Sequence, residues 1–221
     1  MAISLMSSWI SVPKRKKQIP PTSTFEKFIP TFHILIATSG RPCLFNMLHS
    51  LKDELTSNDA ITIVFDGEGA IQRSTFSDDW LKGHQSNIKI IEQTPNLGYW
   101  GHAIRNKYQG ILEPKTTFIM NADDDDIYVS GSFQKLRQLC INKNTLYIAK
   151  FLVKHNNVQV PSQLIHIIQD DIGTPCGIIP FELANKSNWE YKYGGDFDYY
   201  NKLKEYVSDI TFLNTIIYIV D

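Results

Sequence analysis

The sequence has few cysteines, no long apolar run and no excess of charge of one sign. Its three cysteines, Cys43, Cys140 and Cys176, form no CxxC pair. This argues against a disulfide-stapled fold and favours a reducing, cytoplasmic location. No stretch approaches the roughly 18 consecutive apolar residues of a membrane-spanning helix, so we expect no transmembrane segment. Since 22 Lys and Arg oppose 23 Asp and Glu, the net charge gives no reason to expect a nucleic-acid partner.

Several catalytic signatures are also missing. There is no GxSxG, no GxxxxGK[ST] and no GxGxxG, and no cysteine has a neighbouring histidine. These absences argue against a serine or cysteine nucleophile and against the common phosphate-binding loops. An anionic ligand must therefore be held by local donors or by a metal ion. His102 has no HExxH partner, so we interpret it as a structural histidine rather than a zinc ligand.

The chain has 221 residues, of which 43% are hydrophobic, a size and composition typical of one globular domain. We predict an N-terminal arm over residues 1–31 and a single domain over residues 32–221. The arm contains a basic run, PKRKK at residues 13–17. Such a run can be a localisation tag or a phosphate-binding arm, and we favour a solvated tail.

Apolar runs and helical periodicities alternate through the first two thirds of the chain. Strands are predicted at 33–37, 60–65, 88–91 and 117–120, and helices at 44–55, 98–108 and 132–140. Further strands are predicted at 146–153, 158–169 and 211–220, with a helix at 199–207. This alternation predicts an α/β fold with a mostly parallel sheet and helices on both faces. In such folds, ligands bind at the carboxyl ends of the strands.

Four adjacent carboxylates, Asp123 to Asp126, follow a predicted strand. A cation would relieve their mutual repulsion, and Mg²⁺ or Mn²⁺ often joins one or two carboxylates to substrate phosphates. In an extended segment Asp123 and Asp125 would face the same side; if the chain turns, Asp124 and Asp125 could both reach a ligand. The alternative is a solvated loop or a helix cap. The position after a buried strand favours a metal site.

Two other predicted strand ends and one predicted helix carry residues suited to a nucleotide. Thr38, Ser39 and Arg41 offer hydroxyls and a guanidinium after the first strand, which suit contacts to a base or to phosphates. Asp66 ends the second strand and could accept a hydrogen bond from a nucleobase N–H, although Asp-Gly is also an ordinary turn. Arg105 could neutralise a diphosphate or simply pair with a surface acid.

The aromatic segment Trp189–Asp198 contains Asp196 directly after two glycines. Aromatic faces suit the C–H surfaces of sugars, and a nearby carboxylate can act as general base toward a hydroxyl. Alternatively, Asp196 caps the helix that follows. The residues alone do not favour one reading over the other.

Taken together, four segments resemble the GT-A fold of nucleotide-sugar glycosyltransferases, most closely the family 2 type. They are ILIATSGRP, ITIVFDGE, NLGYWGHAIRNK leading into TTFIMNADDDDIY, and GGDFDYYNKL. They occur in family order over about residues 33–205. The resemblance implies a Rossmann-like α/β sheet and transfer of a hexose-type sugar from a nucleoside-diphosphate sugar, with a UDP-sugar as the expected donor. The acceptor would be a hydroxyl of a glycan or of another molecule.

The resemblance also implies roles in metal binding for the acidic run. If DDIY is matched to the family motif, Asp124 lies near the ribose and Asp125 ligates Mn²⁺ or Mg²⁺. If NADD is matched instead, Asn121 takes the first acidic position and Asp123 ligates the metal. The run is one or two acids longer than the family usually shows, so both alignments stay open.

The remaining roles concern the base and the acceptor. Thr38 and Asp66 would contact the nucleotide base, and Asp196 would match the catalytic base of an inverting transferase. The sequence departs from the family where the usual Glu-Asp pair reads Gly195-Asp196 and where an Arg-rich motif is missing. Two other functions compete with this one. A nucleotidyltransferase would need a loop richer in glycine and basic residues than TSGRP, and a non-catalytic nucleotide- or sugar-binding domain would not need Asp196.

Overall fold

The first half of the chain contains four strands of the sheet and two α-helices among its described residues. The computed structural model describes residues 28–67 and 83–220. The elements in this half are β1 (Phe32–Thr38), α1 (Leu44–Leu51), β2 (Ala60–Asp66), β3 (Asn87–Gln93), α2 (His102–Tyr108) and β4 (Phe118–Asp123). The predicted arm lies almost wholly outside the described residues, as does its basic run.

The second half contains shorter elements and one long strand. They are β5 (Ile127–Tyr128), α3 (Ser132–Leu139), β6 (Thr145–Val153), β7 (Val158–Val160), β8 (Gly177–Pro180), α4 (Gly195–Leu203) and β9 (Asp209–Val220). Short 3₁₀ helices, η4 (Tyr99–Gly101), η5 (Gln109–Ile111), η6 (Thr174–Cys176) and η7 (Phe181–Lys186), join some of them.

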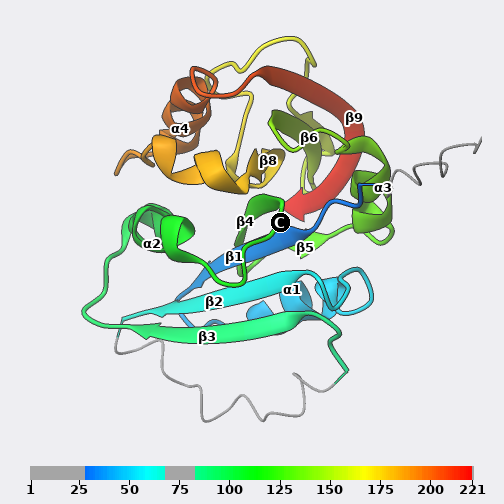
Figure 1. The fold of residues 1–221 in the computed structure, drawn as a ribbon. Coiled ribbons are helices and arrows are strands. Elements are labelled where there is room, and N and C mark those ends of the chain that lie inside the picture. Colours follow the sequence, from blue (N-terminus) through cyan, green and yellow to red (C-terminus); the bar gives the residue numbers. More distant parts are fainter. Residues whose placement is uncertain (1–27, 68–82, 221) are drawn as a thin grey trace, which may run out of the picture.

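All but one of the strands follow a single path, in the order β3-β2-β1-β4-β8-β6-β9-β5, with β7 paired to β6. The first four are parallel; Ala37 of β1 pairs with Val64 of β2 and with Asp123 of β4. Beyond β4 the sheet is mixed, because β8 runs antiparallel to both β4 and β6, whereas β9 is parallel to β6. The sheet curls so that β5, close after β4 in the chain, pairs with β9 at the far end (Figure 1).

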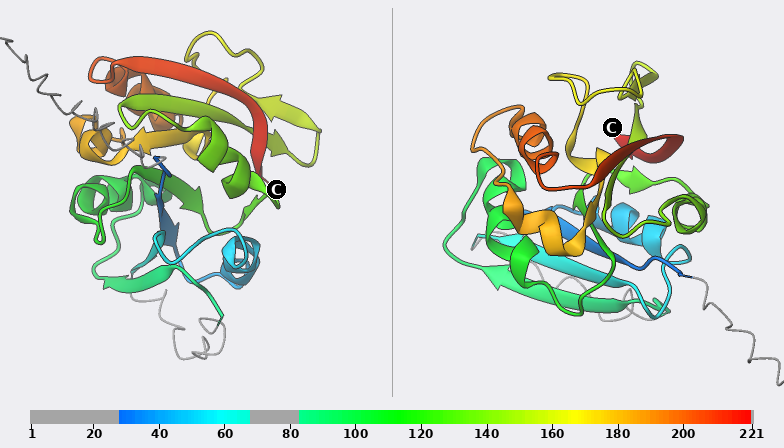
Figure 2. Two further views of the ribbon diagram at one scale, coloured as in Figure 1. Left: turned by 45° about the vertical axis from the view of Figure 1, so that its right-hand side comes forward. Right: turned by 45° about the horizontal axis from the view of Figure 1, so that its top comes forward.

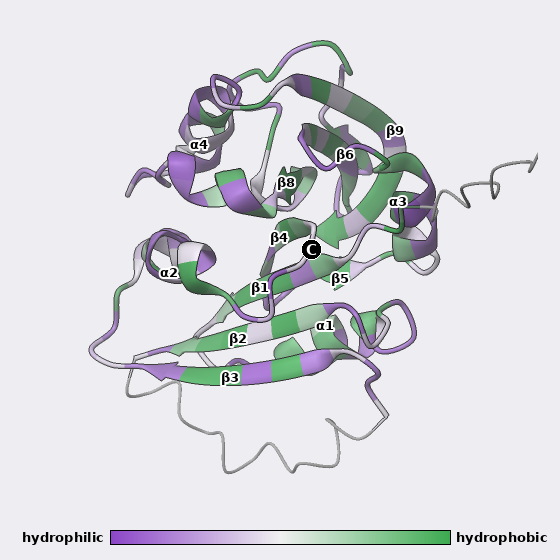
Figure 3. Ribbon diagram, in the orientation of Figure 1, coloured by the Kyte–Doolittle hydropathy of each residue, from purple (hydrophilic) through white to green (hydrophobic). Residues whose placement is uncertain are grey.

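Helices cover both faces of the parallel strands, and α1 and α2 lie on opposite sides of them in every view (Figures 1 and 2). Every residue of β1 is buried, as are nearly all residues of β2 and β4, which explains why these strands read as continuous apolar runs. The edge strand β3 instead alternates between hydrophobic and hydrophilic residues (Figure 3). Leu44, Met47, Leu48 and Leu51 form the buried face of α1. The predicted single-domain α/β fold with helices on both faces is confirmed.

Some predicted element boundaries are wrong, for local reasons. The strand predicted at 158–169 ends at Val160, because Pro161 has no N–H to donate to a ladder and Ser162 bonds to the Asp171 carboxylate instead. The helix predicted at 98–108 becomes α-helical only at His102, after a turn of residues with positive φ. The helix predicted at 199–207 begins at Gly195 and ends at Leu203.

No helix within residues 28–67 and 83–220 is long and apolar enough to cross a membrane.

Candidate functional site

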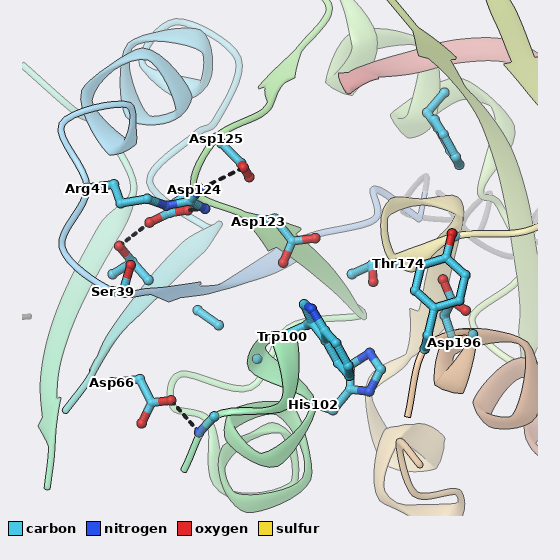
Figure 4. Close-up of a pocket in the computed structure, with 18 of the residues that line it drawn as sticks. Ser39, Arg41, Asp66, Trp100, His102, Asp123, Asp124, Asp125, Thr174 and Asp196 are labelled. Carbon is cyan, nitrogen blue, oxygen red and sulfur yellow. Dashed lines mark hydrogen bonds and ion pairs between the residues drawn. The ribbon is translucent and has the colours of Figure 1, made fainter. Parts of the chain in front are cut away.

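A cavity of about 700 Å³ lies at the carboxyl ends of β1, β2 and β4 (Figure 4). Parallel strands place their carboxyl ends at one edge of the sheet, so the loops that follow them meet there. The predicted site residues that line the cavity are Thr38, Ser39, Arg41, Asp66, Asp123, Asp124, Asp125 and Asp196. Of the predicted site residues, only Arg105 does not line it.

The acidic run turns where β4 ends. Asp123 is the last residue of β4, and the chain turns at Asp124 and Asp125, as in the second of the two geometries considered for the sequence. The Asp124 side chain is only 1% exposed and accepts hydrogen bonds from the Thr38 hydroxyl and the Arg41 guanidinium. The other arm of Arg41 forms an ion pair with Asp125 at 2.8 Å. Arg41 therefore offsets the repulsion between two adjacent carboxylates, and its bonds to Asp124 raise its own pKa.

Arg105 lies fully buried behind Asp123. Its Nη2 is 2.5 Å from Asp123 Oδ1, and its Nη1 donates to the Trp100 carbonyl at 2.8 Å. The guanidinium also lies 5.1 Å from the centre of the Trp189 ring, within cation–π range. In the sequence Arg105 was a candidate for direct contact with a diphosphate. In the structure it fixes the carboxylate that faces the cavity.

The acidic turn fits a divalent cation whose coordination shell is completed by substrate. Within the described part of the chain, no three or more His, Cys, Asp or Glu side chains are grouped so that they could hold a metal ion by themselves. Mg²⁺ and Mn²⁺ commonly use one or two carboxylates, with waters and phosphates supplying the other ligands. Asp123 and Asp125 line the cavity with side chains 35% and 45% exposed. Asp124 is buried by its two partners, so it is the least accessible of the three.

Asp66 organises the loop on the β2 side of the cavity. Its Oδ1 accepts a hydrogen bond from the Leu97 N–H at 2.7 Å, and its Oδ2 accepts one from the Gly98 N–H at 2.8 Å. Asn96 Nδ2 also donates to the Asp66 carbonyl at 3.0 Å. The carboxylate lines the cavity, as the prediction of a base contact requires, but it also anchors residues 96–98.

We expect Asp66→Ala to lower the free energy of unfolding by about 3 kcal/mol, since two hydrogen bonds to a charged group are each worth about 1.5–3 kcal/mol. The Asp66→Asn variant keeps one oxygen and should lose about half as much. Chemical denaturation of the wild type, Asp66→Asn and Asp66→Ala measures their free energies of unfolding, which should decrease in that order. Equal stability of the wild type and the alanine variant would show that the loop does not depend on the carboxylate.

Asp196 is near the start of α4, on the other side of the cavity from Asp124 and Asp125 (Figure 4). Its Oδ1 accepts a hydrogen bond from the Phe197 N–H at 2.9 Å. Asp196 lies in the first turn of α4, and the N-cap position is Gly194, so Asp196 is not the N-cap that the alternative interpretation expected. Burial raises the pKa of this carboxyl, and the Phe197 bond opposes the shift. A carboxylate with a raised pKa that lines a cavity is suited to accept a proton.

His102 presents one ring nitrogen to the same cavity. Its Nδ1 lies 2.7 Å from the Glu190 carbonyl oxygen, and because a carbonyl only accepts, Nδ1 carries the proton and Nε2 is left as an acceptor. Burial lowers the pKa of His102, so the ring is neutral at pH 7. The ring packs on Trp189 with centroids 5.6 Å apart. It therefore has structural contacts, as the sequence suggested, and lines the cavity as well.

Sequence patterns marked the segments that contain Trp100 and Tyr193 without selecting either residue, and no pattern marked Thr174. Trp100, Thr174 and Tyr193 also line the cavity. Thr174 begins η6, and its sequence neighbours carry no motif. Trp100 did have a signal, because Gly98 and Gly101 flank it and paired glycines indicate a backbone with positive φ.

Comparisons with known proteins show similarity in structure alone. No family model and no curated protein sequence matches this chain. A solved structure of S. aureus TarS residues 1–349 has a TM-score of 0.69 and 16% identity, covering 86% of this chain and 60% of that one. The same fragment in complex with UDP gives a TM-score of 0.66, at the same identity and coverage.

A third solved structure is also similar to this chain in fold, at low sequence identity. The mannosyltransferase PcManGT from Pyrobaculum calidifontis, in complex with GDP-Man and Mn²⁺, gives a TM-score of 0.65 and 12% identity. It covers 87% of this chain and 57% of that one. The chain thus spans about 60% of the length of these structures. Together they confirm the GT-A-like fold that the sequence resembles.

Proposed function

We propose that this chain is a nucleotide-sugar glycosyltransferase of the GT-A type, with a UDP-sugar as donor and a hexose-type sugar as the transferred group. The observation that carries the proposal is one cavity that combines an acidic turn and Arg41 at one end with Asp196 at the other (Figure 4). The likeness to structures that hold UDP, or GDP-Man and Mn²⁺, supports the same function. The free thiols of Cys43, Cys140 and Cys176 support the proposed cytoplasmic location.

At the donor end, Asp125 and Asp123 are the proposed metal ligands, since their carboxylates line the cavity and are partly exposed. Mn²⁺ or Mg²⁺ held there would supply the positive charge that offsets the charge of a departing nucleoside diphosphate. Arg41 is half exposed and reaches the same turn. We propose that it exchanges its bond with Asp125 for a donor phosphate, while Arg105 keeps Asp123 in place.

At the acceptor end, Asp196 is the proposed general base. An acceptor hydroxyl would give its proton to the carboxylate while its oxygen attacks the anomeric carbon. The bond from that carbon to the diphosphate oxygen breaks in the same displacement, and the nucleoside diphosphate leaves with the electron pair. A single displacement of this kind inverts the anomeric centre, so we propose an inverting transferase.

Incubation with a panel of UDP-sugars and GDP-mannose, each with Mn²⁺, tests this function. We expect release of UDP or GDP from at least one donor, slow with water and faster with an added acceptor. Release of pyrophosphate from a nucleoside triphosphate and a sugar phosphate would show a nucleotidyltransferase instead. A rise in melting temperature with UDP and Mn²⁺, but no release from any donor, would indicate a non-catalytic binding domain.

A further inference from the structure

We infer that the acceptor is a saccharide, and that one of its sugar rings packs on an aromatic shelf formed by Trp100 and Tyr193 at the mouth of the cavity. The inference rests on the proposed function and specifies its second substrate. Both side chains line the cavity, yet Trp100 is 66% exposed and Tyr193 is 88% exposed. Large aromatic side chains exposed together beside a polar cavity are typical of a ligand surface.

The backbone that carries Trp100 is held in an unusual conformation. Gly98, Tyr99, Trp100 and Gly101 have φ values of 68°, 56°, 52° and 80°, so four consecutive residues are left-handed. Glycine adopts this region freely, but bulky side chains rarely do. Such conformations persist where the surroundings fix them, and they cluster at ligand sites. This left-handed turn, residues 98–101, is therefore a candidate ligand-binding element.

Contacts from three directions fix the left-handed turn. The Asp66 carboxylate accepts the Gly98 N–H at 2.8 Å, and Arg105 donates to the Trp100 carbonyl at 2.8 Å. Gly101 packs so close to β1 that an added Cβ would lie 2.8 Å from the Cβ of Ala37. The turn is thus anchored by its backbone, which leaves the indole of Trp100 exposed at the cavity.

A stacked pair of tyrosines joins the turn to the loop that carries Tyr193. The rings of Tyr99 and Tyr191 lie 4.6 Å apart at an interplanar angle of 13°. Nearby, His102 bonds to the carbonyl of Glu190 in the same loop. These contacts hold the two parts of the shelf in one arrangement before a ligand binds, which reduces the entropy that binding costs.

The polar groups beside the shelf select a sugar over a purely apolar occupant. A pyranose ring has C–H faces that pack on aromatic rings and hydroxyls around its edge. His102 and Asp196 line the same cavity, and an unprotonated Nε2 and a carboxylate can both accept hydrogen bonds. A prenyl or acyl chain would cover these acceptors without bonding them, which is unfavourable. A saccharide satisfies both the aromatic faces and the acceptors.

Saturation-transfer NMR tests the inference directly. The probes are UDP with Mn²⁺, methyl hexosides, and gluco- and manno-oligosaccharides, with farnesyl phosphate as the apolar comparison. We expect saturation of the ring C–H protons of at least one saccharide in the presence of UDP and Mn²⁺. If UDP binds but no saccharide is saturated, or if only farnesyl phosphate is, the inference is overturned while the donor site stands. If neither UDP nor GDP in its place binds, the proposed function fails.

Variants of the shelf give the second readout. Trp100→Ala and Tyr193→Ala should each raise the dissociation constant for the saccharide at least tenfold. Both variants should leave the dissociation constant for UDP unchanged. Trp100→Gly should also lose the saccharide, although its melting temperature should equal or exceed that of the wild type because glycine relieves the left-handed strain. Tyr206→Ala, which removes a 45% exposed tyrosine that does not line the cavity, is the matched control. Unchanged saccharide affinity in all shelf variants would overturn the inference.

Discussion

Replacing Asp196 by asparagine is expected to reduce sugar transfer by about 10²- to 10⁴-fold, the usual contribution of a general base. The amide has nearly the same volume and keeps an oxygen that can accept the Phe197 N–H, but it cannot take a proton from the acceptor. The acidic turn is at the other end of the cavity, so UDP affinity should not change. Transfer rates and UDP binding measured on the same preparation separate the two effects.

Asp170→Asn provides the matched control. Asp170 lines the same cavity and has a φ of 63°, a conformation that asparagine also tolerates. This variant replaces an aspartate by asparagine at a position other than the proposed base. It should transfer sugar at close to the wild-type rate. An Asp196→Asn enzyme that transfers as fast as the wild type would remove Asp196 from the role of base.

The pH dependence of transfer should follow from the same residue. The active form of a general base is the carboxylate, and burial raises the pKa of Asp196. The rate should therefore fall as the pH drops through this raised pKa, above the value of about 3.9 for an ordinary aspartate. A profile of kcat/KM against pH for the wild type should show this acidic limb. The residual activity of Asp196→Asn should show no such acidic limb.

Replacing Arg105 by methionine is expected to lower the free energy of unfolding by about 3 kcal/mol. Removing one partner of a buried ion pair leaves the other charge uncompensated, which costs about 3–5 kcal/mol. We take the lower end because Asp123 is about one third exposed to water. The contacts to Trp100 and Trp189 are lost as well. For a chain of this size the melting temperature should fall by about 6–12 °C.

The double variant Arg105→Met, Asp123→Asn distinguishes an unpaired charge from lost packing. In the Arg105→Met background, removing the Asp123 charge should restore at least half of the lost stability. Asp123→Asn alone leaves the fully buried Arg105 guanidinium without its carboxylate, so it should also destabilise the protein. Thermal and chemical denaturation of the four proteins complete the cycle. Simple additivity of the two single changes would show that the pair does not couple.

The parallel half of the fold could be predicted from the sequence because its signals are local. The run in β1 is largely apolar, since both faces of that strand are covered, and the spacings of four and three residues between Leu44, Leu48 and Leu51 mark one helix face. β8 could not be predicted in this way. Its four residues, Gly177–Pro180, are a strand only because β4 and β6 lie on either side of them.

In the candidate site, too, some features could be predicted from local sequence signals and others could not. Thr38, Asp66 and Asp123 each follow or end a predicted strand, so their convergence followed from the topology of parallel strands. The burial of Arg105 depended on how closely Gly101 allows the start of α2 to approach β1. The shelf depended on contacts between loops about 90 residues apart, such as the stack of Tyr99 on Tyr191. No local pattern encodes either arrangement.

Isothermal titration calorimetry of UDP, and separately of GDP, with and without Mn²⁺ tests the central claim most directly. We expect one of the two nucleotides to bind at a single site per chain and to require the metal. Asp125→Asn should weaken that binding at least tenfold, since it removes a proposed metal ligand at the acidic turn, whereas Asp170→Asn should not weaken it. The absence of binding by either nucleotide in the presence of Mn²⁺, or binding that is indifferent to both the metal and Asp125, would contradict the account.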